Sequence, residues 1–438
     1  MRPYAFILLG LLLAIQSLEA TPACQQKLST RPNVIAAPKT PAGPHFQSPT
    51  RTKVCYVRAF GGGKDDSQTL FSAAKACNNG GTVALLDPLY TIAKPLDLTF
   101  LNAVDFDIQG TITFTTDTAY WMDKSFKYAF QNGCSYWQWG GNDVNWFGGG
   151  TIDGAGQVWY DLFAKNSTIQ RPLLFATIGM HHASMSHINI KNPPNWFDFI
   201  SESSDIIISD MFLSATSNNT NPVKNSDGWD TYRSDHITIQ DSVVLNTDDC
   251  VSFKPNSTNI LVQNMHCNGS HGMSVGSLGQ YRGVTDIAEN IYVYNATMTY
   301  SGDSARIKVY QDAIPLADGT LPSSSGGGNG YVKNITYDGM HDLSDDYAIE
   351  LTTCYAQKNA TLCDLYPSKM ILQDIYFKNF DGTLNAHYDP IVGTLVCSSA
   401  ERCININAEN INITTPSRKP AQWTCKNVDK DLLDINCV

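Results

Sequence analysis

Charged residues are scarce in this chain. They make up 16% of its 438 residues, against roughly a quarter in an average soluble protein. Acidic residues outnumber basic ones, with 41 Asp and Glu against 30 Lys and Arg, and the formal net charge is −11. A surplus of negative charge argues against a nucleic-acid partner. A polyanionic substrate would need a local basic patch.

Several motifs are also missing. No Cys-x-x-Cys pair offers zinc spacing, and the glycine-rich stretches lack the Gly-Lys-Ser/Thr ending of a phosphate loop. We therefore expect no metal and no cofactor. The long apolar run lies within the first 20 residues, follows Arg2 and is too short to span a bilayer. We predict a signal peptide over 1–20 and a secreted, extracellular monomer; a membrane anchor is the alternative.

The cysteines and sequons agree with secretion. The 12 cysteines are an even number, as expected for disulfides in an oxidising compartment. Close spacing predicts the bridges Cys250–Cys267, Cys354–Cys363, Cys397–Cys403 and Cys425–Cys437. Cys55 with Cys77 is a further candidate pair, and Cys24 and Cys134 have no assigned partner. Glycosylation sequons occur at Asn166, Asn218, Asn256, Asn268, Asn295, Asn334, Asn359 and Asn412.

Short strands dominate the pattern from about Thr82 onward. Segments such as Ile260–Asn264 alternate apolar and polar residues, which indicates strands with one buried face. Long helical stretches do not separate them, so a doubly wound fold is disfavoured, and a β-sandwich is the alternative. We predict a helix over Asp65–Cys77, capped by Asp65, that covers the open end of the stack. An extended arm over 21–53 would precede a single domain over 54–438.

One spacing is regular. Asp227, Asp249 and His271 follow one another at equal intervals, with strand-like segments between them. A repeat of about 20 to 25 residues made of short strands predicts a solenoid in which each repeat is one coil. Equivalent positions on stacked coils are roughly 4.8 Å apart. We therefore expect a ladder of these three side chains on one face, with Asp248 beside Asp249.

A cluster of carboxylates has three interpretations: a Ca²⁺ site, an acid–base pair or a solvated corner. The spacing of Asp227, Asp248 and Asp249 lacks the regular ligand pattern of an EF-hand. Adjacent carboxylates raise one another's pKa, so one can stay protonated as an acid while its neighbours stay ionised. Hydrolysis of a glycosidic bond needs that combination.

Four motifs together resemble the polygalacturonase family of glycoside hydrolases, which degrade pectin. They are Asn225-Ser226-Asp227, Asp248-Asp249, His271-Gly272 and Arg306-Ile307-Lys308. The strings over 229–235 and 269–281 are similar to the exo-acting fungal branch. Ser226 replaces the commoner Thr and keeps a hydroxyl, and Ser270 replaces the Gly of endo-acting members.

The resemblance implies a single-domain right-handed parallel β-helix and inverting hydrolysis of α-1,4-linked galacturonate from the non-reducing end. It implies Asp248 as the general acid, Asp227 and Asp249 as water-activating groups, and His271 as a residue that tunes the acid. Arg306 and Lys308 would hold the substrate carboxylate, a role that suits a guanidinium fork and an ammonium. Tyr355 resembles a substrate-site tyrosine of the family.

Other functions stay open. An exo-rhamnogalacturonase is the nearest competitor, followed by an endo-polygalacturonase, a Ca²⁺-dependent pectate lyase and a noncatalytic cell-wall carbohydrate-binding protein. We expect the segments 278–289 and 311–330 to wall a pocket closed at one end. Lys254 is interpreted as a solvated charge, Asp230 and Asp235 as structural corner residues, and most tryptophans as packing residues.

Overall fold

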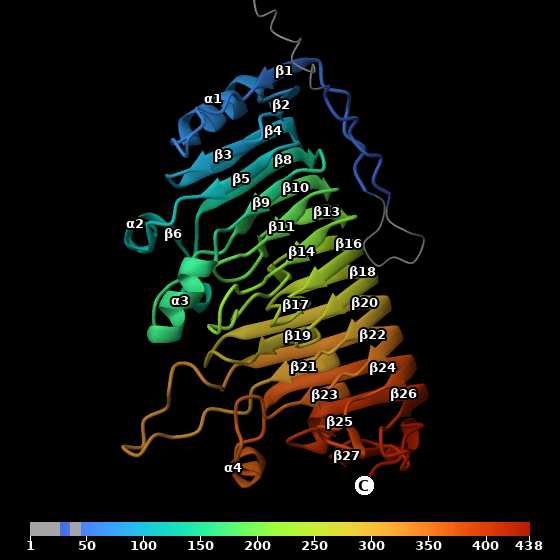
Figure 1. Cartoon of the computed structure of the whole chain (residues 1–438). Coiled ribbons are helices and arrows are strands. Elements are labelled where there is room, and N and C mark those ends of the chain that lie inside the picture. The colour runs from blue at the N-terminus through green and yellow to red at the C-terminus, as the bar shows by residue number, and fades with distance from the viewer. Residues whose placement is uncertain (1–26, 36–44) are drawn as a thin grey trace, which may run out of the picture.

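The computed structural model describes residues 27–35 and 45–438. The chain winds into a stack of coils, blue at the N-terminal end and red at the C-terminal end in Figure 1. Within the described residues, 25 strands join into one continuous parallel network. β6 (Phe126–Lys127) and β7 (Cys134–Ser135) form a separate antiparallel pair. The predicted right-handed parallel β-helix is confirmed.

Each coil contributes to three parallel sheets, here called A, B and C. Sheet A contains β12 (Asp198–Ser201), β15 (Trp229–Tyr232), β17 (Val251–Phe253), β19 (Met273–Leu278), β21 (Asp303–Val309), β23 (Tyr347–Thr352), β25 (Ile391–Val396) and β27 (Gln422–Lys426). Sheet B contains β1 (Lys53–Tyr56), β2 (Gly81–Leu85) and β13 (Ser204–Ser209). Sheet C contains β3 (Leu89–Ile92), β5 (Thr111–Phe114), β9 (Thr151–Asp153), β11 (Asn189–Lys191) and β14 (Phe212–Ser214).

Long bent strands connect the sheets. Three run from sheet A into sheet B: β4 (Leu96–Ile108), β8 (Trp137–Phe147) and β10 (Phe175–Ser186). Six run from sheet B into sheet C: β16 (Asp235–Leu245), β18 (Ser257–Asn268), β20 (Thr285–Thr299), β22 (Asn329–Leu343), β24 (Lys369–Thr383) and β26 (Cys403–Thr414).

Asparagine ladders mark the bends. Asn259, Asn290 and Asn334 occupy equivalent positions on successive coils, each with φ between 53° and 56°. This left-handed backbone is tolerated by Asn better than by most residues. Asn334 donates a side-chain hydrogen bond to Asn290, and Asn290 donates one to Asn259, at 2.7 and 3.0 Å. The ladders therefore help to hold the coils in register.

The helices lie outside the coil. α1 (Ser67–Cys77) covers the N-terminal end of the stack, as predicted, and buries Leu70, Ala74 and Cys77 (Figure 1). It begins two residues later than expected, because the Asp65 carboxylate accepts hydrogen bonds from the backbone and hydroxyl of Ser67. The remaining helices are α2 (Thr118–Lys124), α3 (Gln157–Lys165) and α4 (Ala360–Leu365). None of the described helices is long and apolar enough to cross a bilayer.

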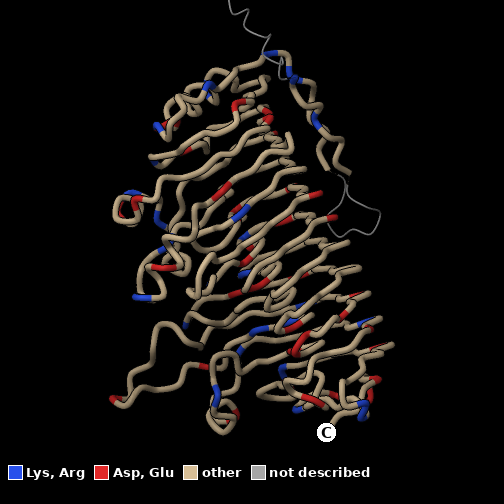
Figure 2. Tube along the Cα trace, viewed as in Figure 1, with Lys and Arg blue, Asp and Glu red and all other residues tan. Residues whose placement is uncertain are grey.

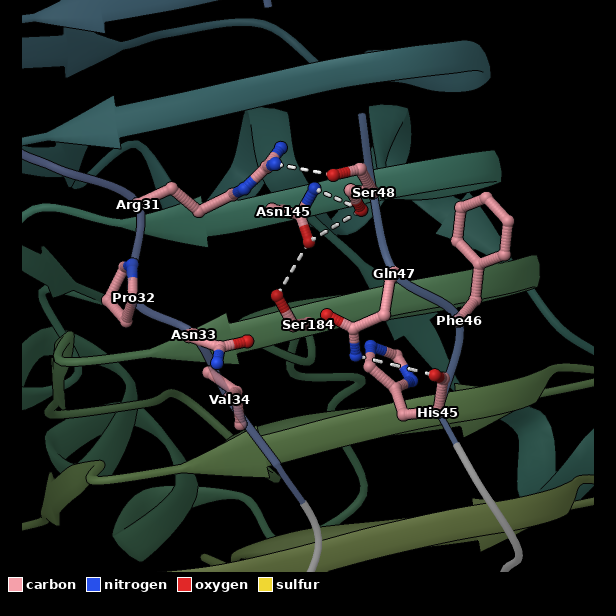
Figure 3. Close-up of a pocket in the computed structure, with 10 residues that line it drawn as sticks. All are labelled: Arg31, Pro32, Asn33, Val34, His45, Phe46, Gln47, Ser48, Asn145 and Ser184. Carbon is pink, nitrogen blue, oxygen red and sulfur yellow. Dashed lines mark hydrogen bonds between the residues drawn. The ribbon is translucent and has the colours of Figure 1, made fainter. Parts of the chain in front are cut away.

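The described parts of the N-terminal arm, residues 27–35 and 45–52, lie against sheet B. Arg51 forms ion pairs with Asp105 and Asp143 at 3.0 and 2.8 Å. Ser48 and Asn145 exchange hydrogen bonds across a small cavity of about 150 Å³, and Figure 3 shows both side chains at its edge. Because this cavity lies on sheet B, it is separate from the site on sheet A described below. The predicted signal peptide lies outside the described residues.

Five disulfides join coils and loops within the described residues. Four are the bridges that spacing predicts: Cys250–Cys267, Cys354–Cys363, Cys397–Cys403 and Cys425–Cys437. The fifth joins the candidate pair Cys55 and Cys77. Cys134 is a buried free thiol, and Cys24 lies outside the described residues. The predicted packing role of the tryptophans also holds, since Trp137, Trp139 and Trp146 are buried in the core.

Candidate active site

Sheet A carries the predicted ladder. Its strands β15, β17 and β19 pair in parallel, and the sequence offset between partners is the same in both pairings. Asp227, Asp249 and His271 each lie two residues before the first paired residue of their strand. The structure therefore places them on three successive coils, as the spacing predicts. Acidic and basic residues lie close together along these middle coils (Figure 2).

Hydrogen bonds fix the turn that carries the paired aspartates. The side-chain amide of Asn246 donates to the carbonyl oxygens of Ser226, Asp248 and Asp249 at 2.8 to 3.0 Å. The Ser226 hydroxyl accepts a hydrogen bond from the backbone of Thr247 at 2.9 Å. Ser226 can do this because it keeps the hydroxyl of the commoner Thr. The two motifs thus hold each other in place.

Asp248 is the most accessible of the three carboxylates. Its side chain is 18% exposed, against 5% for Asp227 and 1% for Asp249. Nδ1 of His271 lies 3.3 Å from Oδ1 of Asp248. The hydrogen bond to Asp248 raises the pKa of His271 against the opposing effect of its burial. Asp248 thus favours the protonated form of the imidazole beside it.

Asp249 is held in its ionised form. Lys308 Nζ lies 2.5 Å from Oδ2 of Asp249, and the Ser274 hydroxyl donates to Oδ1 at 2.7 Å. Burial alone would raise the pKa of Asp249, but the charges of Lys308 and Lys254 outweigh it and lower that pKa. These donors keep Asp249 ionised, so its carboxylate is free of a proton and able to accept one.

Asp227 behaves differently. Burial, assisted by the charge of Asp248, raises the pKa of Asp227 to about 7, although Lys254 opposes the shift. Lys254 Nζ lies 3.2 Å from Asp227 and 3.5 Å from Asp230. The cluster consequently retains a proton below neutral pH, which an acid–base mechanism requires. It also means that Asp249 is better placed than Asp227 to serve as the ionised base.

Arg306 lies on the C-terminal side of the carboxylates. Its Nε lies 2.7 Å from Glu350 and 3.2 Å from Asp303. As expected for residues two apart on a strand, Arg306 and Lys308 project to the same side, and both lie near the ring of Tyr355, at 6.0 and 5.7 Å.

Two hollows border this region. One, of about 330 Å³, is lined by residues that include His271, Arg306 and Tyr355. The other, of about 540 Å³, shares Arg306 and Tyr355 and extends along the loop closed by the Cys354–Cys363 bridge. The two hollows therefore extend from His271 toward the C-terminal coils.

Comparison with known proteins decides the family. The profile of glycosyl hydrolases family 28 matches residues 77–433. The chain belongs to this family. It is 52% identical to the exopolygalacturonase of Cochliobolus carbonum over 389 residues, covering 89% of this chain and 86% of the relative. It is 48% identical to exopolygalacturonase X of Aspergillus niger over 416 residues, covering 95% of each. The solved endo-xylogalacturonan hydrolase of Aspergillus tubingensis matches with a TM-score of 0.78 and 32% identity, over 88% of this chain and 99% of that one.

A metal would have few free ligands in this family 28 site. Within the described residues, Asp248, Asp249 and His271 offer ligand atoms within 4.8 Å of one another. Both carboxylate oxygens of Asp249 are already bonded, to Lys308 and Ser274. A cation there would have to displace the Lys308 ammonium, while Ca²⁺ prefers six to eight oxygen ligands. The donor set favours acid–base chemistry.

Sequence reasoning missed three parts of the site. Lys254, expected to be a solvated charge, is 4% exposed and pairs with Asp227 and Asp230. Asp230 is therefore the partner of a buried lysine in the middle of β15, not a corner residue. The sequence did contain a signal for Lys254. The interval from Lys254 to Gly276 equals the interval from Asp227 to Asp249, and Gly276 is in register with Lys308. Lys254 therefore belongs to the same row of the sheet as Lys308.

The other two missed parts are Glu350, which holds Arg306, and Arg171. Arg171 is buried and donates to the side chain of Asn225 and to the backbone of Lys224. It thereby positions the loop before Asp227. Asp235, by contrast, accepts hydrogen bonds from Thr258 and Asn259 at a corner, as expected.

Proposed function

We propose that this chain is a secreted exopolygalacturonase that releases galacturonate from the non-reducing end of pectic polygalacturonate. The observation that carries the proposal is the set of three carboxylates on sheet A, one accessible and two buried against lysines. The names of the relatives at about half identity support the substrate and the exo mode. The fold alone does not set the mode, because a neighbour of the same fold is named an endo enzyme.

In the proposed mechanism Asp248 protonates the leaving glycosidic oxygen, because its side chain is the accessible one. Asp249, kept ionised by Lys308, activates a water on the opposite face of the sugar, and Asp227 helps to position that water. His271 tunes Asp248. Direct attack by water inverts the anomeric carbon, so an α-linkage yields a β-configured product.

Arg306, Lys308 and Tyr355 bind the uronate in this proposal. A guanidinium presents parallel donors to a planar carboxylate, and an ammonium adds a point charge. Both cations lie near Tyr355, whose ring borders both hollows. They would supply the donors that hold a carboxylate of an acidic polymer.

Secretion, domain limits and oligomeric state belong to the same proposal. Residues 1–20 would direct export, 21–53 would form an arm, and 54–438 would form one catalytic domain that acts as a monomer. Five disulfides support an oxidising compartment. The eight sequons would be candidate glycosylation sites, and exposed ones, such as Asn166 and Asn218, are accessible.

Product analysis on polygalacturonate tests the function. We expect galacturonate monomer alone from the first minutes, released as the β-anomer and detected by proton NMR. A spread of oligomers would indicate an endo enzyme, an unsaturated product a lyase, and activity confined to rhamnogalacturonan the competing specificity. The variant Asp248→Asn should lower kcat by about 10²- to 10⁴-fold. Asp123→Asn, on the exposed side of α2, is the matched control.

A further inference from the structure

The outward-facing side chains of sheet A change character at the coil before Asp227. One row of residues in register crosses the sheet from Phe199 through Asp230, Ser252 and Ser274 to Arg306. Toward the C-terminal coils this row is polar and borders the two hollows. Toward the N-terminal coils it begins with an aromatic ring. The two directions along the sheet therefore offer different surfaces to a polysaccharide.

A small hairpin covers the aromatic end. It comprises residues 126–135, which include β6, β7 and a short 3-10 turn over Phe130–Asn132, and is called the plug below. The ring of Phe130 stacks on Tyr232 with centroids 4.0 Å apart and an angle of 21° between the planes. It also stacks on Phe199 at 6.0 Å and 5°. Phe199 and Tyr232 themselves lie on the adjacent strands β12 and β15.

The base of the plug is fastened to the coil. The Tyr128 hydroxyl bonds the Ser135 hydroxyl at 2.6 Å, and the Tyr128 ring lies 6.0 Å from Phe199. The backbone of Leu173 donates to the carbonyl of Cys134 at 2.6 Å. Burial raises the pKa of Tyr128 to about 12, in agreement with a closely packed base. The plug is thus fastened to the coil at β7, and the Tyr128–Ser135 hydrogen bond closes its base.

The tip of the plug reaches the loop that follows β19. The backbone of Gln131 in the tip lies near the Tyr281 hydroxyl and acts to lower its pKa against the effect of burial. Tyr281 is in turn bridged to Ser324 in the long loop between β21 and β22. Of the two segments expected from the sequence to wall a pocket, 278–289 therefore reaches the plug, and it is joined in turn to 311–330.

We propose that the plug closes the substrate groove on the N-terminal side, one coil before Asp227, and so restricts cleavage to a chain end. This inference rests on the proposed exopolygalacturonase function. A polymer lying across sheet A cannot continue past the stacked rings of Phe130, Phe199 and Tyr232. Its terminal sugar stops between these rings and Asp248, and the following uronates extend over Arg306 into the two hollows.

The test compares products from purified full-length variants. Phe130→Ala removes the stacked ring, and a second variant replaces residues 129–132 by two glycines. Phe212→Ala, an exposed ring on β14 of sheet C, is the matched control. Each variant is checked by thermal unfolding, then incubated with polygalacturonate while product length and viscosity are followed.

We expect the wild type and Phe212→Ala to release monomer alone with little loss of viscosity. Phe130→Ala and the shortened hairpin should add dimers and trimers and lower the viscosity more for each bond cleaved. If both variants are folded and still yield monomer alone, the plug does not set the mode of action. If the shortened hairpin does not fold, Phe130→Ala decides. A wild type that releases mixed oligomers would also overturn the inference, whereas one that cleaves no polygalacturonate would overturn the proposed function itself.

Discussion

Replacing Lys254 by methionine should reveal how much the site depends on a buried ammonium. Methionine is close in length to lysine but carries no charge, and Lys254 is 4% exposed. The ammonium lies 3.2 Å from Asp227 and 3.5 Å from Asp230. At an effective dielectric constant of about 20, each contact corresponds to roughly 5 kcal/mol of Coulomb attraction when the carboxylate is ionised. The cost of desolvating the charges offsets much of this, so the loss measured on removing one partner is about 3–5 kcal/mol.

The loss should grow with pH. Burial raises the pKa of both Asp227 and Asp230, and the charge of Lys254 opposes the shift in each. At low pH the two carboxyls are neutral, so removing Lys254 costs little attraction there. Without Lys254 both pKa values rise further. At higher pH the carboxyls must either ionise unpaired or hold protons that the unfolded chain has released. The free energy of unfolding of Lys254→Met should therefore fall more steeply than that of the wild type between about pH 5 and pH 8.

Urea unfolding at about pH 5 and at about pH 8 measures this change in the free energy of unfolding. Lys369→Met is the matched control, because Lys369 forms a 2.8 Å ion pair with Asp312 and its side chain is 50% exposed. A surface pair of this kind contributes about 0–1 kcal/mol. Adding Asp230→Asn to Lys254→Met should recover part of the loss. Equal costs for the two lysine variants at the higher pH, or no recovery in the double variant, would refute the reasoning.

Three further predictions concern ligands and pH. Activity should be unchanged in EDTA, because Lys308 already occupies the Asp249 oxygen that a cation would need; loss of activity that Ca²⁺ restores would contradict this. Arg306→Lys should raise KM on oligogalacturonates more than it lowers kcat, because lysine keeps the charge but lacks the planar fork; an unchanged KM would exclude the clamp. Burial and mutual repulsion raise the pKa of Asp342, and burial raises that of Asp345 to about 6. The folded state thus keeps protons that the unfolded chain releases above about pH 4, and its stability falls as pH rises. Asp342→Asn should flatten this fall between about pH 5 and pH 8 in urea unfolding, and an unaltered slope would argue against a titrating pair.

The regular part of the site could be predicted because the coils from β15 to β19 contain no insertion. Their constant sequence offset places Asp227, Asp249 and His271 in one ladder. Beyond β19 the loops over 279–284 and 310–328 lengthen the coils, and the position equivalent to His271 recurs at Asp303 and Tyr347. A prediction from constant spacing does not hold for these longer coils. The ion pairs of Arg306 with Asp303 and Glu350 were therefore not predicted.

Other features depend on tertiary contacts that local patterns do not encode. Helix α1 begins after Asp66, whose carboxylate is used to bind the backbone of Phe60 and Thr91. Lys254 occupies an outward position on its coil, yet it is 4% exposed and its ammonium lies 4.9 Å from the ring of Trp196, which is distant in the sequence. The plug shows no periodicity at all, because its contacts with Phe199 and Tyr232 join segments that are far apart in the sequence.

The ion pairs change the explanation of how an acidic protein would hold an acidic polymer. Lys308 is paired with Asp249, and Arg306 with Glu350 and Asp303, so neither is an uncommitted charge. Both contacts of Arg306 use Nε, however, and its two terminal nitrogens form no hydrogen bond with any described residue. Since a guanidinium binds a carboxylate through parallel N–H groups, Glu350 and Asp303 orient the fork and leave its outer edge for the uronate. Recognition in this proposal therefore comes from donors fixed in direction, and the net charge of the chain need not change sign.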